Sequence, residues 1–253
     1  MKVSIVQTDI AWANPETNAT AIGRMLDTHT GADLYVLPEM FSTGFATNPD
    51  HIAESDGLSI RWMSEQARSR QCAMMGSVAT KEAGRFFNRL YFVWPDGNVE
   101  HYDKRHLFSH GGEDKRFTAG RRRVVVAYRG FRILLQVCYD LRFPVFSRNR
   151  QDYDMAVYVA NWPTSRLSAW TALLRARAIE NQCFVVGVNR VGQDPTCQYS
   201  GGSEIIDFQG RTIAGCQHGM PDVATADLSL DELVEARRRF AVLPDADNFT
   251  LAD

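Results

Sequence analysis

Short apolar runs alternate with amphipathic segments along nearly the whole chain, and the two patterns differ in their period. Compact runs rich in β-branched and aromatic residues predict strands at residues 3–7, 32–37, 73–79, 155–160 and 184–189. Apolar positions recurring every three or four residues predict helices at residues 15–27, 59–70, 167–181 and 230–239. Asn14 and Pro15 form a typical N-cap and first helical position for the first of these helices.

Three further pairs of apolar runs are separated by turn residues and predict β-hairpins. The paired runs are residues 86–94 with 99–102, 124–128 with 131–137, and 203–208 with 212–214. No Pro/Ser-rich linker, low-complexity segment or internal repeat interrupts this order. Strands mixed with both helices and hairpins favour one α/β domain over residues 1–253. The residues from about 241 onward read as a tail.

Three residues with acid, base or nucleophilic side chains follow predicted strands. Glu39 follows the run that ends at Pro38, Lys104 follows the strand around 99–102, and Cys138 follows the apolar run 132–137. A cysteine in such a place is more often a small core residue, and a lone Glu or Lys usually lies on the surface. Side chains at strand ends converge on one cleft, however, so the three together predict a site.

The segments around these residues resemble the nitrilase (carbon–nitrogen hydrolase) superfamily, whose signature is Glu, Lys and Cys in that chain order. The matching segments are residues 37–41, 102–108 and 138–144, and segments 160–163 and 175–182 also look like family segments. A second Glu of the signature is matched by Glu113. The resemblance extends from Met1 to about Leu243 and implies an α-β-β-α sandwich, commonly paired into a homodimer.

Within the superfamily the chain looks most like the omega-amidase branch. That resemblance implies hydrolysis of the terminal amide of small dicarboxylate monoamides, such as 2-oxoglutaramate, through a cysteine thioester. Cys138 would be the nucleophile and Glu39 the base that accepts its proton. Lys104 would lower the thiol pKa and stabilise the oxyanion, and the backbone N–H of Tyr139 would be a second oxyanion donor. Glu113 would orient Lys104 or the substrate amide, although a simple loop carboxylate is nearly as compatible with the sequence.

Arg142 is the candidate for binding the substrate carboxylate, because a guanidinium forms two parallel hydrogen bonds with a carboxylate. An internal ion pair between Arg142 and Asp140 or another acid is the alternative for that residue. Trp162 and Phe41 are candidates for the pocket walls, and either could equally belong to the core.

Other functions remain open on the sequence. A papain-like cysteine hydrolase would need a histidine base beside Cys138, and the local signatures of that class are missing. A catalytically inactive binding relative would be expected to have lost Glu39, Lys104 or Cys138, and all three are present. A nitrile or an N-carbamoyl compound as the substrate is compatible with the superfamily.

Composition limits the possible partners and cofactors. The net charge of -2 gives no electrostatic case for nucleic acid. Five scattered cysteines without a CxxC pair suit a reducing cytoplasm. The N-terminus turns polar too soon for a signal peptide, and no apolar stretch approaches the ~20 residues that span a bilayer. His101, His106 and His110 lack a zinc-ligand spacing. We therefore expect no metal and no cofactor.

Overall fold

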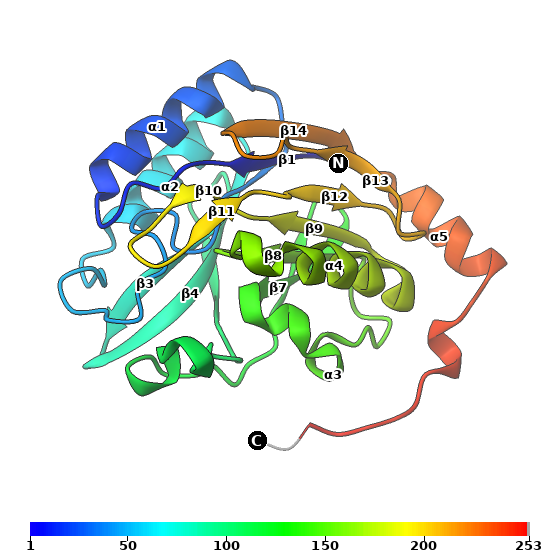
Figure 1. Ribbon diagram of the computed structural model, residues 1–253. Helices are drawn as coiled ribbons and strands as arrows, with labels where there is room; N and C mark the ends of the chain where they lie inside the picture. Colours follow the sequence, from blue (N-terminus) through cyan, green and yellow to red (C-terminus); the bar gives the residue numbers. More distant parts are fainter. Residues whose placement is uncertain (252–253) are drawn as a thin grey trace.

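The computed structural model describes residues 1–251 and contains two six-stranded sheets, with a two-stranded ribbon at one end (Figure 1). The first sheet has the strand order β14 (Asp222–Asp227), β1 (Lys2–Gln7), β2 (Leu34–Val36), β3 (Ala73–Glu82), β4 (Arg85–Val93) and β5 (Val99–Asp103). The second has the order β13 (Thr212–Gly215), β12 (Glu204–Ile206), β9 (Phe184–Val188), β8 (Met155–Val159), β7 (Phe131–Val137) and β6 (Val125–Tyr128). The ribbon pairs β10 (Val191–Gln193) with β11 (Gln198–Ser200).

Each sheet has parallel strands at its centre and antiparallel strands at its edges. Strands β1, β2 and β3 run parallel, as do β7, β8 and β9. The three predicted hairpins are confirmed as the antiparallel pairs β4–β5, β6–β7 and β12–β13. The carboxyl ends of the parallel strands therefore lie together, which is where Glu39 and Cys138 follow β2 and β7.

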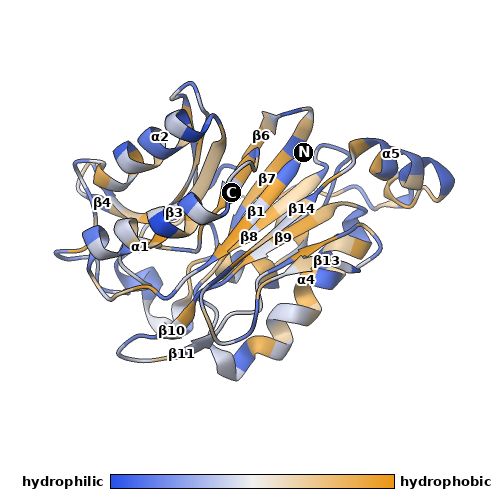
Figure 2. Ribbon diagram, turned by 90° about the horizontal axis from the view of Figure 1, so that it is seen from above, coloured by the Kyte–Doolittle hydropathy of each residue, from blue (hydrophilic) through white to orange (hydrophobic). Residues whose placement is uncertain are grey.

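The two sheets pack face to face, and helices cover their outer faces, so the α-β-β-α sandwich is confirmed (Figure 1). Alternate residues of each strand point into the space between the sheets, as Val3 and Ile5 of β1 do against Val157 of β8 and Val186 of β9. The hydrophobic residues concentrate on these strands (Figure 2). Burial of this shared apolar layer is the main force that holds the sheets together.

The helices bury their apolar stripes on the outer faces of the sheets. α1 (Pro15–Thr28) and α2 (Leu58–Arg70) cover the first sheet, and α4 (Leu167–Asn181) covers the second. The Asn14 side chain accepts from the Thr17 N–H, which confirms the predicted N-cap. The remaining helices are α3 (Pro144–Ser147) and α5 (Leu230–Arg239), and a 3-10 turn at Leu243–Asp245 follows α5. No helix within residues 1–251 is long and apolar enough to cross a membrane.

Several elements lie outside the sequence prediction. The hairpin between β3 and β4, the ribbon β10–β11 and the edge strand β14 were not expected. β2 is shorter than the predicted 32–37, because it begins only at Leu34 and ends at Val36 ahead of Pro38. β14 pairs with β1 at the other end of the chain, and its exposed alternate residues give it little apolar signal. Pairings between such distant segments are decided by the packed fold.

Candidate active site

Cys138 stands at a sharp turn between β7 and the 3-10 helix Cys138–Arg142. Its φ of 43° lies in the left-handed region, which is costly for a residue with a side chain and recurs at functional sites. Asp140 holds this turn. Its buried carboxylate accepts from the Val137 N–H at 2.9 Å, the Tyr102 hydroxyl at 2.9 Å and the His106 N–H at 3.0 Å. The turn is thereby anchored to the segment that carries Lys104.

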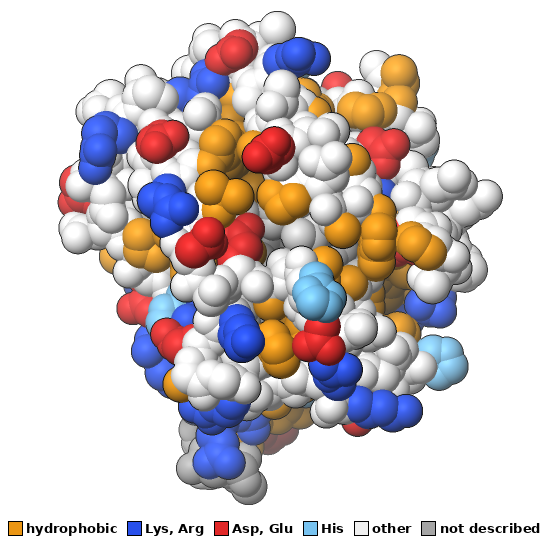
Figure 3. Space-filling view, turned by 90° about the vertical axis from the view of Figure 1, so that its left-hand side faces the viewer, with side chains coloured by type: hydrophobic (Ala, Val, Ile, Leu, Met, Phe, Trp, Pro, Cys, Tyr) orange, Lys and Arg blue, Asp and Glu red, His pale blue; other side chains and the backbone are white. Residues whose placement is uncertain are grey.

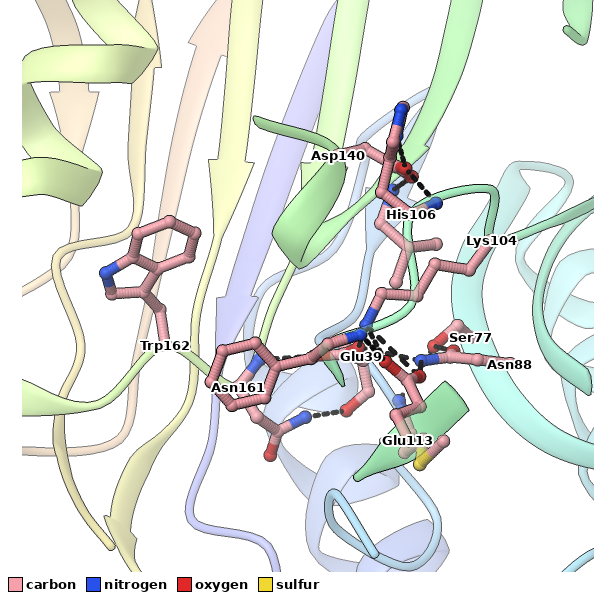
Figure 4. A network of polar contacts seen from close by, with 12 residues as sticks. Glu39, Ser77, Asn88, Lys104, His106, Glu113, Asp140, Asn161 and Trp162 are labelled. Carbon is pink, nitrogen blue, oxygen red and sulfur yellow. Dashed lines mark hydrogen bonds and ion pairs between the residues drawn. The ribbon is translucent and has the colours of Figure 1, made fainter. Parts of the chain in front are cut away.

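Lys104, Glu39 and Glu113 form a fully buried cluster of charges (Figure 4). The Lys104 Nζ lies 3.0 Å from Glu39 Oε1 and 2.9 Å from Glu113 Oε2. Glu113, which begins the 3-10 turn Glu113–Lys115, also accepts from the Phe108 N–H at 2.6 Å. Glu113 was predicted to orient either Lys104 or the substrate amide, and in the structure it contacts Lys104. The Lys104 ammonium is thus held by two carboxylates.

Two asparagines complete the cluster, and sequence analysis missed both. Asn88 Nδ2 donates to Glu39 Oε1 at 2.7 Å and to Glu113 Oε1 at 3.1 Å. The Asn161 N–H donates to Glu39 Oε2 at 2.8 Å, and its side chain donates to the Glu39 carbonyl at 2.5 Å. An asparagine in the middle of the apolar and aromatic strand 86–93 was the available signal, because a buried polar group requires a partner. Together these donors fix both oxygens of the Glu39 carboxylate.

Burial and the charges around Cys138 shift the pKa of its thiol. Burial and the Glu39 carboxylate raise the pKa of Cys138 well above its ordinary value, although Lys104 opposes them. Burial would lower the pKa of Lys104, but Glu113 and Glu39 outweigh it and raise that pKa. Lys104 lowers the thiol pKa, as the sequence analysis predicted, but the pKa is raised on balance. Its effect is present but smaller than those of burial and Glu39.

The cluster opens into a pocket of about 640 Å³, a volume ordinary for a small-molecule site. Glu39, Lys104 and Cys138 lie at the pocket together with Tyr139 and Arg142. Figure 3 shows the side of the molecule that carries β3, β4 and the β10–β11 ribbon, where hydrophobic side chains gather among charged ones. Aromatic walls and a few polar groups are the usual composition of a ligand site.

Arg142 lines this pocket without a carboxylate partner. Its guanidinium lies 4.9 Å from the ring centre of Trp162, and within residues 1–251 it forms neither an ion pair nor a hydrogen bond. The alternative ion pair with Asp140 is wrong, because both oxygens of that carboxylate are occupied by other donors. The guanidinium therefore faces the pocket with its donors unused.

The two aromatic candidates for the pocket wall, Trp162 and Phe41, lie in different surroundings. Trp162 is buried, lines the pocket and packs on Trp170, so it is both wall and core. Phe41 is not a pocket residue. It lies in the core beside Trp62, with ring centroids 5.8 Å apart, and its ring lies over Gly76, where an added Cβ would come within 2.9 Å. Phe45 forms part of the wall in its place, 5.2 Å from Lys104 Nζ.

The histidines do not form a metal site. Within residues 1–251 no group of three or more His, Cys, Asp or Glu side chains is arranged to hold a metal ion. His106 Nδ1 lies 2.7 Å from Asp140 Oδ1, and the ring stacks on Phe143. The charged groups that act on the Cys138 thiol are Glu39, Lys104 and Glu113, with no histidine among them, so the imidazole pairing of a papain-like hydrolase does not describe this site.

A two-sheet α-β-β-α sandwich with a Glu–Lys–Cys cluster at its strand ends defines a class of protein, that of the nitrilase superfamily. The chain belongs to the carbon-nitrogen hydrolase family, whose model matches residues 2–238.

Relatives that match almost end to end carry amidase names. Omega-amidase YafV of Yersinia enterocolitica is 44% identical, over 99% of this chain and 98% of its own. The 2-oxoglutaramate amidase of Bacillus subtilis is 33% identical, over 96% of each chain. The crystal structure of XC1258 from Xanthomonas campestris, a CN-hydrolase superfamily protein with an arsenic adduct in the active site, is 43% identical with a TM-score of 0.96. It covers 100% of this chain and 99% of its own.

Proposed function

We propose that this chain hydrolyses the terminal amide of short dicarboxylate monoamides, of which 2-oxoglutaramate is the model, to the acid and ammonia. The observation that carries the proposal is one pocket that holds a thiol, a carboxylate that can act as its base, and an unused guanidinium. Cys138 and Glu39 line the pocket together, the Glu39 charge acts on the thiol, and Arg142 lacks a carboxylate partner among residues 1–251. The names of the relatives support the same substrate class.

In the first half of the reaction, Cys138 Sγ attacks the amide carbon while the thiol proton passes to Glu39. The carbonyl π electrons move to oxygen, and the oxyanion is stabilised by Lys104 and by the Tyr139 N–H. That N–H belongs to the first turn of a 3-10 helix, where donors have no partner within the helix. Collapse of the intermediate breaks the C–N bond, and the proton on Glu39 leaves with ammonia. A thioester remains on Cys138.

In the second half, water attacks the thioester carbon and Glu39 removes a proton from it. The second tetrahedral oxyanion uses the same two donors, and collapse breaks the C–S bond. The carboxylic acid is released, and the Cys138 sulfur recovers its proton from Glu39. Glu113 and Asn88 do not touch the reacting atoms in this scheme; they position Lys104 and Glu39. Arg142 binds the distant carboxylate and so sets the length of the substrate.

The test is replacement of the nucleophile. Cys138→Ala is expected to abolish ammonia release from 2-oxoglutaramate and to retain the circular dichroism of the wild type, because little volume is lost. Iodoacetamide should label Cys138 before the buried Cys72, Cys183 and Cys216. Cys216→Ala, at a buried cysteine that does not line the pocket, is the matched control and should stay active. Full turnover by Cys138→Ala would overturn the proposal.

The same assay separates the remaining substrate classes. Ammonia release should be fast from monoamides with a free carboxylate, and slow from nitriles and N-carbamoyl compounds of similar size. A preference for either of the latter would place the chain elsewhere in the superfamily. We further propose a homodimer in the cytoplasm, on the family resemblance and on the five free cysteines. Light scattering of the purified protein tests the dimer.

A further inference from the structure

A second arginine lines the pocket without an ionic partner. Arg166 ends the 3-10 turn Thr164–Arg166 and is half-buried. Its guanidinium lies 5.5 Å from the ring centre of Phe108, another pocket residue. Within residues 1–251 this guanidinium has neither an ion pair nor a hydrogen bond. Like Arg142, it presents charged donors to the pocket and stacks on an aromatic wall.

Trp162 links the two arginines. Arg142 lies over the Trp162 ring, and Trp162 Nε1 donates to the Arg166 carbonyl at 2.7 Å. Arg166 is also the N-cap residue of the 15-residue helix α4. The first turn of that helix carries no acidic residue and receives no side-chain cap from Arg166, so its N–H groups add positive potential beside the guanidinium.

The acidic residues of the pocket do not offset these charges. Glu39 is bound by Lys104, Asn88 and Asn161. Asp50 is paired with Arg116 at 2.5 Å. Among the described pocket-lining residues, therefore, no carboxylate is left without a partner to receive a substrate ammonium group.

We propose that Arg166 is a second specificity-determining residue, which donates to the 2-oxo oxygen next to the carboxylate that Arg142 binds. The same charge repels a 2-ammonium group, so the pocket selects monoamides of 2-oxo acids and rejects those of 2-amino acids such as glutamine. This inference rests on the proposed function. The inference adds discrimination at the second carbon of the substrate. A 2-amino acid carries an ammonium cation there, whereas a 2-oxo acid carries an oxygen that accepts hydrogen bonds.

The experiment compares three substrates of equal length: 2-oxoglutaramate, glutaramate without a 2-substituent, and glutamine. In Arg166→Gln, kcat/KM for 2-oxoglutaramate should fall about tenfold relative to glutaramate, as expected for a lost charge-assisted hydrogen bond. The same variant should raise kcat/KM for glutamine relative to glutaramate. Arg166→Lys should keep the rejection of glutamine but recover only part of the 2-oxo preference. Arg142→Gln should lower the rates with 2-oxoglutaramate and glutaramate alike.

Arg24→Gln is the matched control, because it removes one exposed guanidinium from α1 and should change none of the three rates. Equal losses on all three substrates in Arg166→Gln would overturn the inference and make Arg166 structural, and so would a wild type that accepts glutamine as readily as glutaramate. Either result leaves the proposed function standing if wild type still hydrolyses 2-oxoglutaramate. A wild type that hydrolyses none of the three overturns both.

Discussion

Glu39 is the residue on which most polar contacts of the site converge. Lys104 and Asn88 approach one carboxylate oxygen, and the Asn161 N–H approaches the other. The negative charge of the same group also acts on the Cys138 thiol. A carboxylate held this rigidly has two consequences that oppose each other. It raises the pKa of the thiol, and it is placed to take the thiol proton as attack begins.

These two effects are separable in the variant Glu39→Gln. Removing the negative charge leaves Lys104 less opposed, so the pKa of Cys138 should fall and more thiolate should be present at a given pH. Turnover should nevertheless fall by at least about a hundredfold, because the base is lost. The pH dependence of thiolate absorbance, corrected with Cys138→Ser, gives the pKa, and ammonia release gives the rate.

Glu65→Gln is the control for this prediction, since Glu65 is exposed on α2 and should leave both values unchanged. A rise in turnover together with a fall in thiol pKa would mean that the thiolate concentration, and not proton transfer to Glu39, limits the reaction.

At the scale of elements, Asp154 ties together three parts of the second sheet and its surroundings. Its nearly buried carboxylate pairs with Arg132 of β7 at 2.8 Å and with Arg237 of α5 at 2.8 Å, just before β8 begins. Burial would raise the pKa of Asp154, but the hydrogen bonds from Arg132 and Arg237 outweigh it and lower that pKa. The pairing therefore stabilises the ionised form in the folded state.

Asp154→Asn should lower the free energy of unfolding at neutral pH by about 2 kcal/mol, because the partly buried Arg237 and the more exposed Arg132 lose their charged hydrogen-bond acceptor. Since the folded pKa lies below the unfolded one, the wild-type stabilisation is present above about pH 4 and is lost as the pH falls through the folded value. The variant should lack this part of the acid dependence. Urea unfolding at pH 7 and in acid measures both effects.

Asp27→Asn provides the comparison, because the Asp27–Arg70 pair is solvent-exposed on the Asp27 side. An exposed ion pair contributes less than about 1 kcal/mol. Equal losses in the two variants would show that the Asp154 pairs do not hold α5 and β7 to the sheet.

At the scale of the whole molecule, the layer between the sheets makes them mutually dependent. Val3 and Ile5 of the first sheet belong to the same buried cluster as Val157 and Val186 of the second. Each sheet needs the other to shield its apolar inner face from water, so we expect one cooperative unfolding transition. Near-ultraviolet circular dichroism, tryptophan fluorescence and far-ultraviolet circular dichroism should give coincident urea curves. Two resolved transitions would mean that the sheets unfold as separate units.

Much of this protein follows from the sequence by itself. Local periodicity suffices for α4 and α5, whose bounds match those predicted, and turn residues suffice for three hairpins. The chain order of Glu39, Lys104 and Cys138 indicated the family, because each stands in its own short segment after a strand. These signals are local, so a single sequence carries them.

Tertiary structure decided the rest, because the deciding contacts join distant segments. Asn88 and Asn161 become part of the site only when β4 and the end of β8 meet Glu39. Phe45 and not Phe41 forms a wall, since the Phe41 ring packs on Gly76 in the core. Whether Arg142 pairs with Asp140 could likewise not be decided from the sequence. In the structure Asp140 accepts from other donors, and the guanidinium of Arg142 is left unused. Side-chain direction and charge partnership depend on packing, and a linear pattern does not contain them.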